Sequence, residues 1–180
     1  MYIIIPFESF QPNNVFFGKR QTNNMVSYCY FTNVMYSTPN YSMTNIMFRI
    51  NIQPQSIKIT NEMMYISFDT NYTKHKDLTS HISSLETQIL KLYRGTKDNV
   101  YNQENITNQL MKGVLKLHLS AVLKSTYENY NENNLNVLLR ISGIWENEYS
   151  KVGLIYKFIL PNKQNQESND HHTYIPEYIH

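Results

Sequence analysis

One run with helical spacing interrupts a sequence that otherwise alternates between apolar and polar residues. Within it, apolar side chains recur at intervals of four and three, at Leu78, Ile82, Leu85, Ile89 and Leu92. This spacing places them on one face of a helix. Asp77 stands where a residue could cap the start of that helix, and Gly95 stands where a glycine could end it. The pattern therefore predicts an amphipathic helix over about 78–93.

Stretches typical of strands lie on both sides of this helix, because they are rich in aromatic and β-branched residues. They cover residues 25–36, 46–52, 56–59, 63–68, 114–119, 135–145 and 152–160. A second, short helix is expected over about 104–112, ending at Gly113. The order of strands, helix and strands predicts an α+β, mainly β protein with an OB-fold-like, partly open barrel, although other α+β arrangements share that order.

The chain of 180 residues suits one domain, expected over 1–161, followed by a flexible polar tail over 162–180. The N-terminus lacks the pattern of a signal peptide, and no apolar run approaches the ~20 residues that a bilayer requires. A soluble, intracellular protein without membrane contact is therefore expected. Because Cys29 is the only cysteine, neither an intrachain disulfide nor a multi-cysteine metal site is expected.

Charge is unevenly distributed along the chain. Twelve of the sixteen lysines and arginines precede residue 126, whereas seven of the fourteen acidic residues follow it. A basic body with an acidic end suits a protein that binds a polyanion. Solvated surface charge produces the same asymmetry about as often.

The run "VLLRISGIWENEYSKVGLIYKFIL", residues 137–160, predicts a hairpin. Because alternate side chains of a strand face opposite ways, Arg140 and Lys157 can share its outer surface. Gly143 favours a bulge ahead of Trp145, the only tryptophan. Cations beside an aromatic ring are typical of a groove for single-stranded nucleic acid. Trp145 is, however, explained more simply as hairpin core.

Aromatic and basic residues on other strands extend this hypothesis. Tyr28 and Tyr30 share one face of the first long strand, and tyrosines at strand spacing are more often half-buried sheet residues than stacking platforms. Basic residues on the following strands add to the surface. The predicted nucleic-acid-binding residues are Tyr28, Tyr30, Arg49, Lys58, Lys116, Arg140, Trp145 and Lys157.

Sequence signatures of enzymes are absent. The five glycines match no phosphate-binding loop, and neither G-x-S-x-G nor H-E-x-x-H occurs. His171 and His172 lie beside Asp170 in the polar tail, where an incidental pair is the simpler explanation than a metal site. Neither catalysis, a cofactor nor a metal is expected.

The hairpin segment "ISGIWENEYSKVGLIYKF", residues 141–158, resembles the single-stranded DNA-binding proteins of nucleocytoplasmic large DNA viruses, which are similar to those of tailed phages. "SYCYFTN" at 27–33 and "SSLETQILKLY" at 83–93 resemble the same group more loosely. The resemblance implies binding of single-stranded DNA without sequence preference, in viral replication, recombination or repair. The chain would then act in the host cytoplasm or the virion.

The expected partners are single-stranded DNA and replication proteins contacted through the C-terminal tail, with a homo-oligomer left open. The tail carries only Glu167, Asp170 and Glu177, whereas phage relatives end in a strongly acidic tail. The rival hypothesis is a structural or assembly protein of a large DNA virus, whose tyrosine-rich strands form protein contacts.

Overall fold

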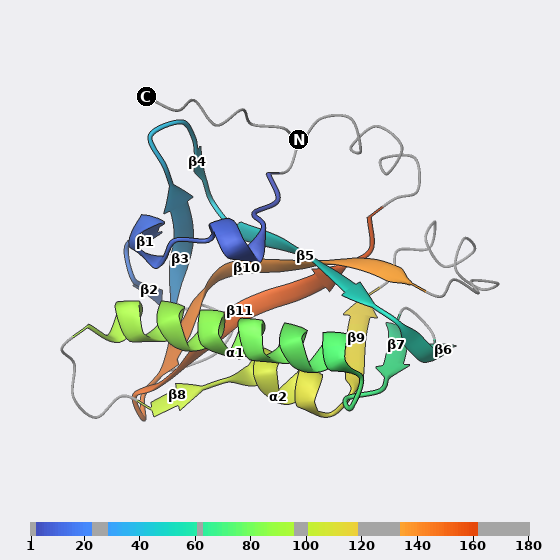
Figure 1. Cartoon of the computed structure of the whole chain (residues 1–180). Helices are drawn as coiled ribbons and strands as arrows, with labels where there is room; N and C mark the ends of the chain where they lie inside the picture. The colour runs from blue at the N-terminus through green and yellow to red at the C-terminus, as the bar shows by residue number, and fades with distance from the viewer. Residues whose placement is uncertain (1–2, 23–28, 61–62, 96–100, 119–133, 162–180) are drawn as a thin grey trace.

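A computed structural model describes residues 3–22, 29–60, 63–95, 101–118 and 134–161 (Figure 1). Two 3-10 turns, η1 (Phe7–Ser9) and η2 (Pro12–Asn14), precede the first strand. The helices are α1 (Thr73–Arg94) and α2 (Asn105–Met111). The strands are β1 (Val15–Phe17), β2 (Gln21–Thr22), β3 (Cys29–Ser37), β4 (Ser42–Met43), β5 (Ile46–Ile52), β6 (Pro54–Thr60), β7 (Met63–Phe68), β8 (Tyr101–Gln103), β9 (Val114–His118), β10 (Leu135–Asn147) and β11 (Lys151–Ile159).

Strand β10 organises the larger sheet. Its first half pairs antiparallel with β5, its second half pairs with β3, and β11 runs antiparallel along its other side. The register between β10 and β11 shifts between Ile141 and Gly143, which confirms the bulge expected at that glycine. Because one strand changes neighbour along its length, the sheet curls into a half-barrel around α1 (Figure 1). The predicted α+β, mainly β, OB-fold-like class is confirmed.

A smaller sheet in the order β6, β7, β9 continues the curvature. Residues 46–52 and 63–68 form strands with the bounds that alternation predicts. The strand expected over 56–59 begins earlier, at Pro54, which is tolerated because β6 is an edge strand and the register shifts between Pro54 and Ser56.

Helix α1 begins five residues earlier than expected. Thr73 is its first residue and Asp77 lies inside it, exposed, so the predicted cap is wrong. The extra turn is held by His75, which is buried, with Nδ1 2.6 Å from the carbonyl oxygen of Asp69 and Nε2 accepting the Gln53 N–H. The C-terminal end of α1 is as predicted. Gly95 ends the helix at a positive φ of 56°, and its N–H donates to Lys91 O.

The buried face of α1 is shifted from the one its spacing suggests, because it includes Leu90 and Glu86 and leaves out Leu92. Ile82, Leu85 and Ile89 are buried, whereas Leu92 is exposed at the last turn. The buried core joins α1 and α2 to both sheets. No helix in the described part of the chain is both long enough and apolar enough to span a bilayer.

Helix α2, close to the predicted 104–112, is attached to α1 by a buried carboxylate. Glu86 accepts the N–H groups of Ile106 and Thr107 and the hydroxyl of Thr107, at 2.8 to 3.2 Å. The N–H groups of Ile106 and Thr107 are among the backbone donors that the first turn of a helix leaves unsatisfied. Gly113 then turns the chain into β9 at a φ of 66°, where a Cβ would meet Phe68 O at 2.7 Å. Glu86 and Gly113 thereby position α2 beside β9.

Candidate functional site

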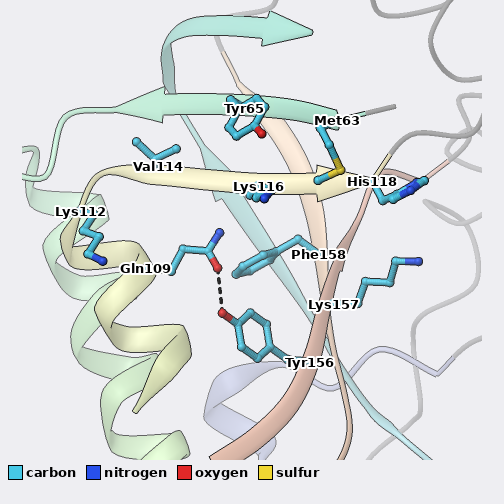
Figure 2. Close-up of a pocket in the computed structure, with 10 residues that line it drawn as sticks. All are labelled: Met63, Tyr65, Gln109, Lys112, Val114, Lys116, His118, Tyr156, Lys157 and Phe158. Atoms are coloured by element: carbon cyan, nitrogen blue, oxygen red, sulfur yellow. Dashed lines mark hydrogen bonds between the residues drawn. The ribbon is translucent and has the colours of Figure 1, made fainter. Parts of the chain in front are cut away.

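The two sheets leave an opening between β9 and β11. No ladder joins these two strands among the described residues, and a groove of about 460 Å³ lies there. Figure 2 shows its lining, which comes from β7, β9, β11 and α2. The lining residues are Met63, Tyr65, Gln109, Lys112, Val114, Lys116, His118, Tyr156, Lys157 and Phe158.

Tyr65 and Lys116 of the smaller sheet line one wall of the groove, and Lys58 extends this row of basic and aromatic side chains beyond the lining. Lys58 and Lys116 are the cross-strand partners of Tyr65 on its two sides, so all three side chains share the outer face of that sheet. The ammonium group of Lys116 lies 5.8 Å from the centroid of the Tyr65 ring, within the range of a cation–π contact. Lys58 and Lys116 were both predicted to bind nucleic acid. The structure brings them together around Tyr65, which was not predicted.

The floor is aromatic and less exposed. Tyr156 packs edge-on against Phe158, with ring centroids 5.6 Å apart, and its hydroxyl donates to Gln109 Oε1 at 2.8 Å (Figure 2). Burial, and secondarily the charge of Glu86, raise the pKa of Tyr156. Its hydroxyl therefore remains a proton donor at neutral pH.

The rim is positively charged. Lys112, Lys116 and Lys157 are exposed, and none of the lining residues is acidic. Within the described ranges, the single ion pair joins Arg20 to Glu146 at 3.2 Å. The three lysines therefore have no carboxylate partner there, and an incoming anion would not have to displace one.

Lys157 also links the groove to the outer face of the larger sheet. Its cross-strand partner is Arg140, which confirms that these two cations share a face. Arg49 stands opposite Leu138, two residues from Arg140, and so adds a third cation to that face. Leu138 itself is buried although its position is on the outer side. Arg140 donates to Asn45 Oδ1 at 3.3 Å.

Two aromatic rings lie flat on this outer face. A Cβ built on Gly153 would meet the Trp145 indole at 2.7 to 2.8 Å, and one built on Gly143 would meet the Phe31 ring at 2.4 Å. Each ring thus occupies space that only a glycine leaves free. Phe31 and Trp145 are cross-strand partners and both are half-buried. Trp145 is therefore neither buried core nor fully exposed.

Of the two predicted tyrosines, the structure describes Tyr30, and Tyr30 does not join this face. Tyr30 pairs with Glu146, the neighbour of Trp145 in sequence, and therefore lies on the opposite side of the sheet. There the guanidinium of Arg20 covers its ring at 3.5 Å. Tyr28 lies outside the described residues.

Sequence reasoning missed Gln109 and Tyr156 of the groove, and it also missed Tyr65, Phe31 and Lys112. Tyr65 alternates correctly within the 63–68 run, so strand periodicity could have identified it. Phe31 alternates with Tyr30 along β3, so it lies on the face opposite to the predicted tyrosine. Lys112 follows the second helix directly, and only the fold places it beside β9.

The arrangement can bind a flexible anion with aromatic groups, because ammonium groups neutralise phosphates while ring faces stack on bases. In the described part of the chain, no three His, Cys, Asp or Glu residues are grouped so as to hold a metal ion. Comparisons with protein family models, with curated proteins and with solved structures find no match.

Proposed function

We propose that this protein binds single-stranded DNA without sequence specificity, through the groove between β9 and β11 and the adjoining outer face of β10 and β11. The observation that carries the proposal is the row of Lys58, Tyr65 and Lys116 on the smaller sheet, of which Tyr65 and Lys116 line the groove together with Lys157. Stacking on such a row requires bases with free faces, which a duplex does not offer. A single strand is therefore the better fit.

The two surfaces form one path because Lys157 belongs to both. It lines the groove and is the cross-strand partner of Arg140. A strand held in the groove by Lys112 and Lys116 would leave past Lys157 and continue over Arg140 toward Trp145. Contacts of these cations with the DNA phosphates would supply most of the affinity. Stacking of bases on the rings along the path would add affinity that does not depend on the DNA sequence.

The biological role rests on the hairpin. Strands β10 and β11 contain the segment that resembles the single-stranded DNA-binding proteins of large DNA viruses, and they contribute Lys157, Arg140 and Trp145 to the proposed path. Support of viral DNA replication, recombination or repair is the role that this resemblance favours. Replication proteins are proposed partners of the C-terminal tail, whose residues 162–180 lie outside the described ranges.

The test is titration of a labelled oligo-dT with the protein, followed by fluorescence anisotropy over a series of salt concentrations. Each phosphate neutralised contributes about 0.7 to the slope of log affinity against log salt for a single strand. The triple variant Lys112→Ala, Lys116→Ala, Lys157→Ala should bind more weakly and lower that slope by about 2. Absence of binding by the wild type at low salt would refute the proposal.

Lys91→Ala is the matched control. Lys91 is an exposed lysine in the last turn of α1, at the end of the helix that lies away from β9 (Figure 1). It should leave both the affinity and the salt slope nearly unchanged. A loss in the control as large as one third of the loss in the triple variant would mean that only overall charge matters, and the groove would not be the site.

A role in assembly is the second candidate, and one observation favours it. Tyr101 and Tyr149 are 66% and 70% exposed, and they lie near each other because the Tyr101 N–H donates to Ser150 O. Exposed tyrosines of this kind are enriched in protein interfaces. Light scattering would support this candidate by showing a discrete oligomer that Tyr101→Ala with Tyr149→Ala dissociates and that oligo-dT leaves unchanged.

A further inference from the structure

The amide of Gln109 is held in one orientation inside the groove. The Tyr156 hydroxyl has a single proton, and it lies 2.8 Å from Gln109 Oε1 but 3.4 Å from the carbonyl oxygen of Asn105. The nearer acceptor takes that proton. With Oε1 occupied, the Nε2 group of Gln109 points away from Tyr156 toward β9 (Figure 2), and it has no hydrogen-bond partner among the described residues.

Depth in the groove separates phosphate contacts from base contacts. Lys112, Lys116 and Lys157 are exposed at the rim, whereas Gln109 and Tyr156 are half-buried and Phe158 is buried. A nucleotide whose phosphate stays with the lysines would insert its base toward Gln109. The edge that enters deepest is the one opposite the glycosidic bond, which carries O4 in thymine and uracil and the amino group N4 in cytosine.

Gln109 Nε2 can only donate hydrogen bonds. It can therefore pair with O4 of uracil or thymine, or O6 of guanine, but it would face another donor at N4 of cytosine or N6 of adenine. A donor placed against a donor leaves both unsatisfied in a partly buried site, which is unfavourable.

We propose that Gln109, oriented by Tyr156, gives the groove a preference for bases that carry a carbonyl oxygen opposite the glycosidic bond over bases that carry an amino group there. The inference rests on the proposed function, and it names the base chemistry that the same site favours. It predicts a bias in base composition and no recognition of a defined sequence.

The test compares oligo-dU with oligo-dC of equal length, at a mildly alkaline pH that keeps cytosine neutral. Both are pyrimidines without a methyl group, so stacking and hydrophobic differences are small. Wild-type protein should bind oligo-dU about threefold to tenfold more tightly, the range for one net hydrogen bond. In Gln109→Leu this ratio should fall to near one, through weaker oligo-dU binding and equal or tighter oligo-dC binding, because the clash of two donors is removed.

Tyr156→Phe keeps the ring and removes the hydroxyl that orients the amide, so it should also reduce the ratio while the salt slope stays as in the wild type. The inference is overturned if the wild type binds oligo-dC as tightly as oligo-dU, or if Gln109→Leu keeps the wild-type ratio. Equal, salt-sensitive binding of both oligomers would overturn this inference alone. Failure to bind either would overturn the proposed function with it.

Discussion

Gly153 lies directly beneath the indole of Trp145, so close that a Cβ at this position would be 2.7 Å from the indole Nε1. The ring cannot move inward, because the strand backbone is there. It can accommodate a methyl group only by lifting off the sheet. Glycine at this position therefore sets where the only tryptophan of the chain lies.

Gly153→Ala should displace Trp145 and lower the free energy of unfolding by about 1–3 kcal/mol, as overpacking usually does. Urea denaturation followed by Trp145 fluorescence measures both effects, since the emission of the folded variant should also shift. Gly18→Ala is the matched control, because the nearest atom to its Cβ would be Asn33 Cβ at 3.4 Å. Equal stability of the two variants would contradict the packing described for Trp145.

Trp145 should report binding directly if the outer face is part of the proposed path. Oligo-dT is expected to quench its fluorescence at low salt, because a base would stack near the half-buried indole, and high salt should reverse the quenching. Arg140→Ala should weaken the quenching, since Arg140 is the nearest predicted cation along β10. Unchanged emission, with binding verified by anisotropy, would confine the path to the groove.

Local pattern predicts much of this fold. Alternation predicted the bounds of β5 and β7 to the residue, and it placed Arg140 on the outer side of β10, whose neighbours Leu139 and Ile141 are buried on the inner side. Gly143 signalled the bulge. These features depend on neighbours in sequence, because the pleat of a strand fixes which side each residue faces.

Contacts between residues far apart in the sequence could not be predicted from local alternation. The first turn of α1 exists because His75 bonds to Asp69 and Gln53, and α2 is capped by Glu86, which lies 20 residues before Ile106. The short strands β1, β2, β4 and β8 have two or three residues, too few for a period to be seen.

The same distinction applies to the site. Arg140 and Lys157 are neighbours within one hairpin, so the alternation of its two strands sufficed to pair them. Bringing Lys112 and Lys116 to the same groove as Lys157 required the closure of the half-barrel. Both faces of β3 carry aromatic residues, and only the pairing of Tyr30 with Glu146 shows that Tyr30 lies on the other face from Trp145.

Tyr65 should be the main stacking residue of the groove. Tyr65→Ala is expected to lower the affinity for oligo-dT by about 1–3 kcal/mol, the usual contribution of one stacked base, whereas Tyr65→Phe should retain most of it. Anisotropy titrations at fixed salt would measure this difference. Tyr149→Ala, at the exposed tip of the β10–β11 hairpin, is the control and should bind as the wild type does. If Tyr65→Ala also binds as the wild type does, stacking on this ring is excluded.

Glu86 should make stability depend on pH in the direction opposite to that of most carboxylates. Burial raises its pKa above the ordinary value of 4.5, although hydrogen bonds from Thr107 and Ile106 act the other way. The folded state therefore keeps the Glu86 carboxyl protonated at pH values where the unfolded state has released that proton. Since stability falls with pH wherever the folded state binds more protons, the contribution of Glu86 is fully present below 4.5 and is lost as pH rises through the folded pKa.

Urea denaturation of the wild type and of Glu86→Gln over this pH range would measure the effect. The free energy of unfolding of the wild type, relative to the variant, should decline as pH rises above 4.5, because glutamine does not titrate. Glu8→Gln, at an exposed carboxylate, should give a curve parallel to that of the wild type. Parallel curves for Glu86→Gln as well would show that burial does not govern this carboxyl. Glu86→Ala should cost about 1–3 kcal/mol at low pH, and less as pH rises, because the N–H groups of Ile106 and Thr107 would then be buried without an acceptor.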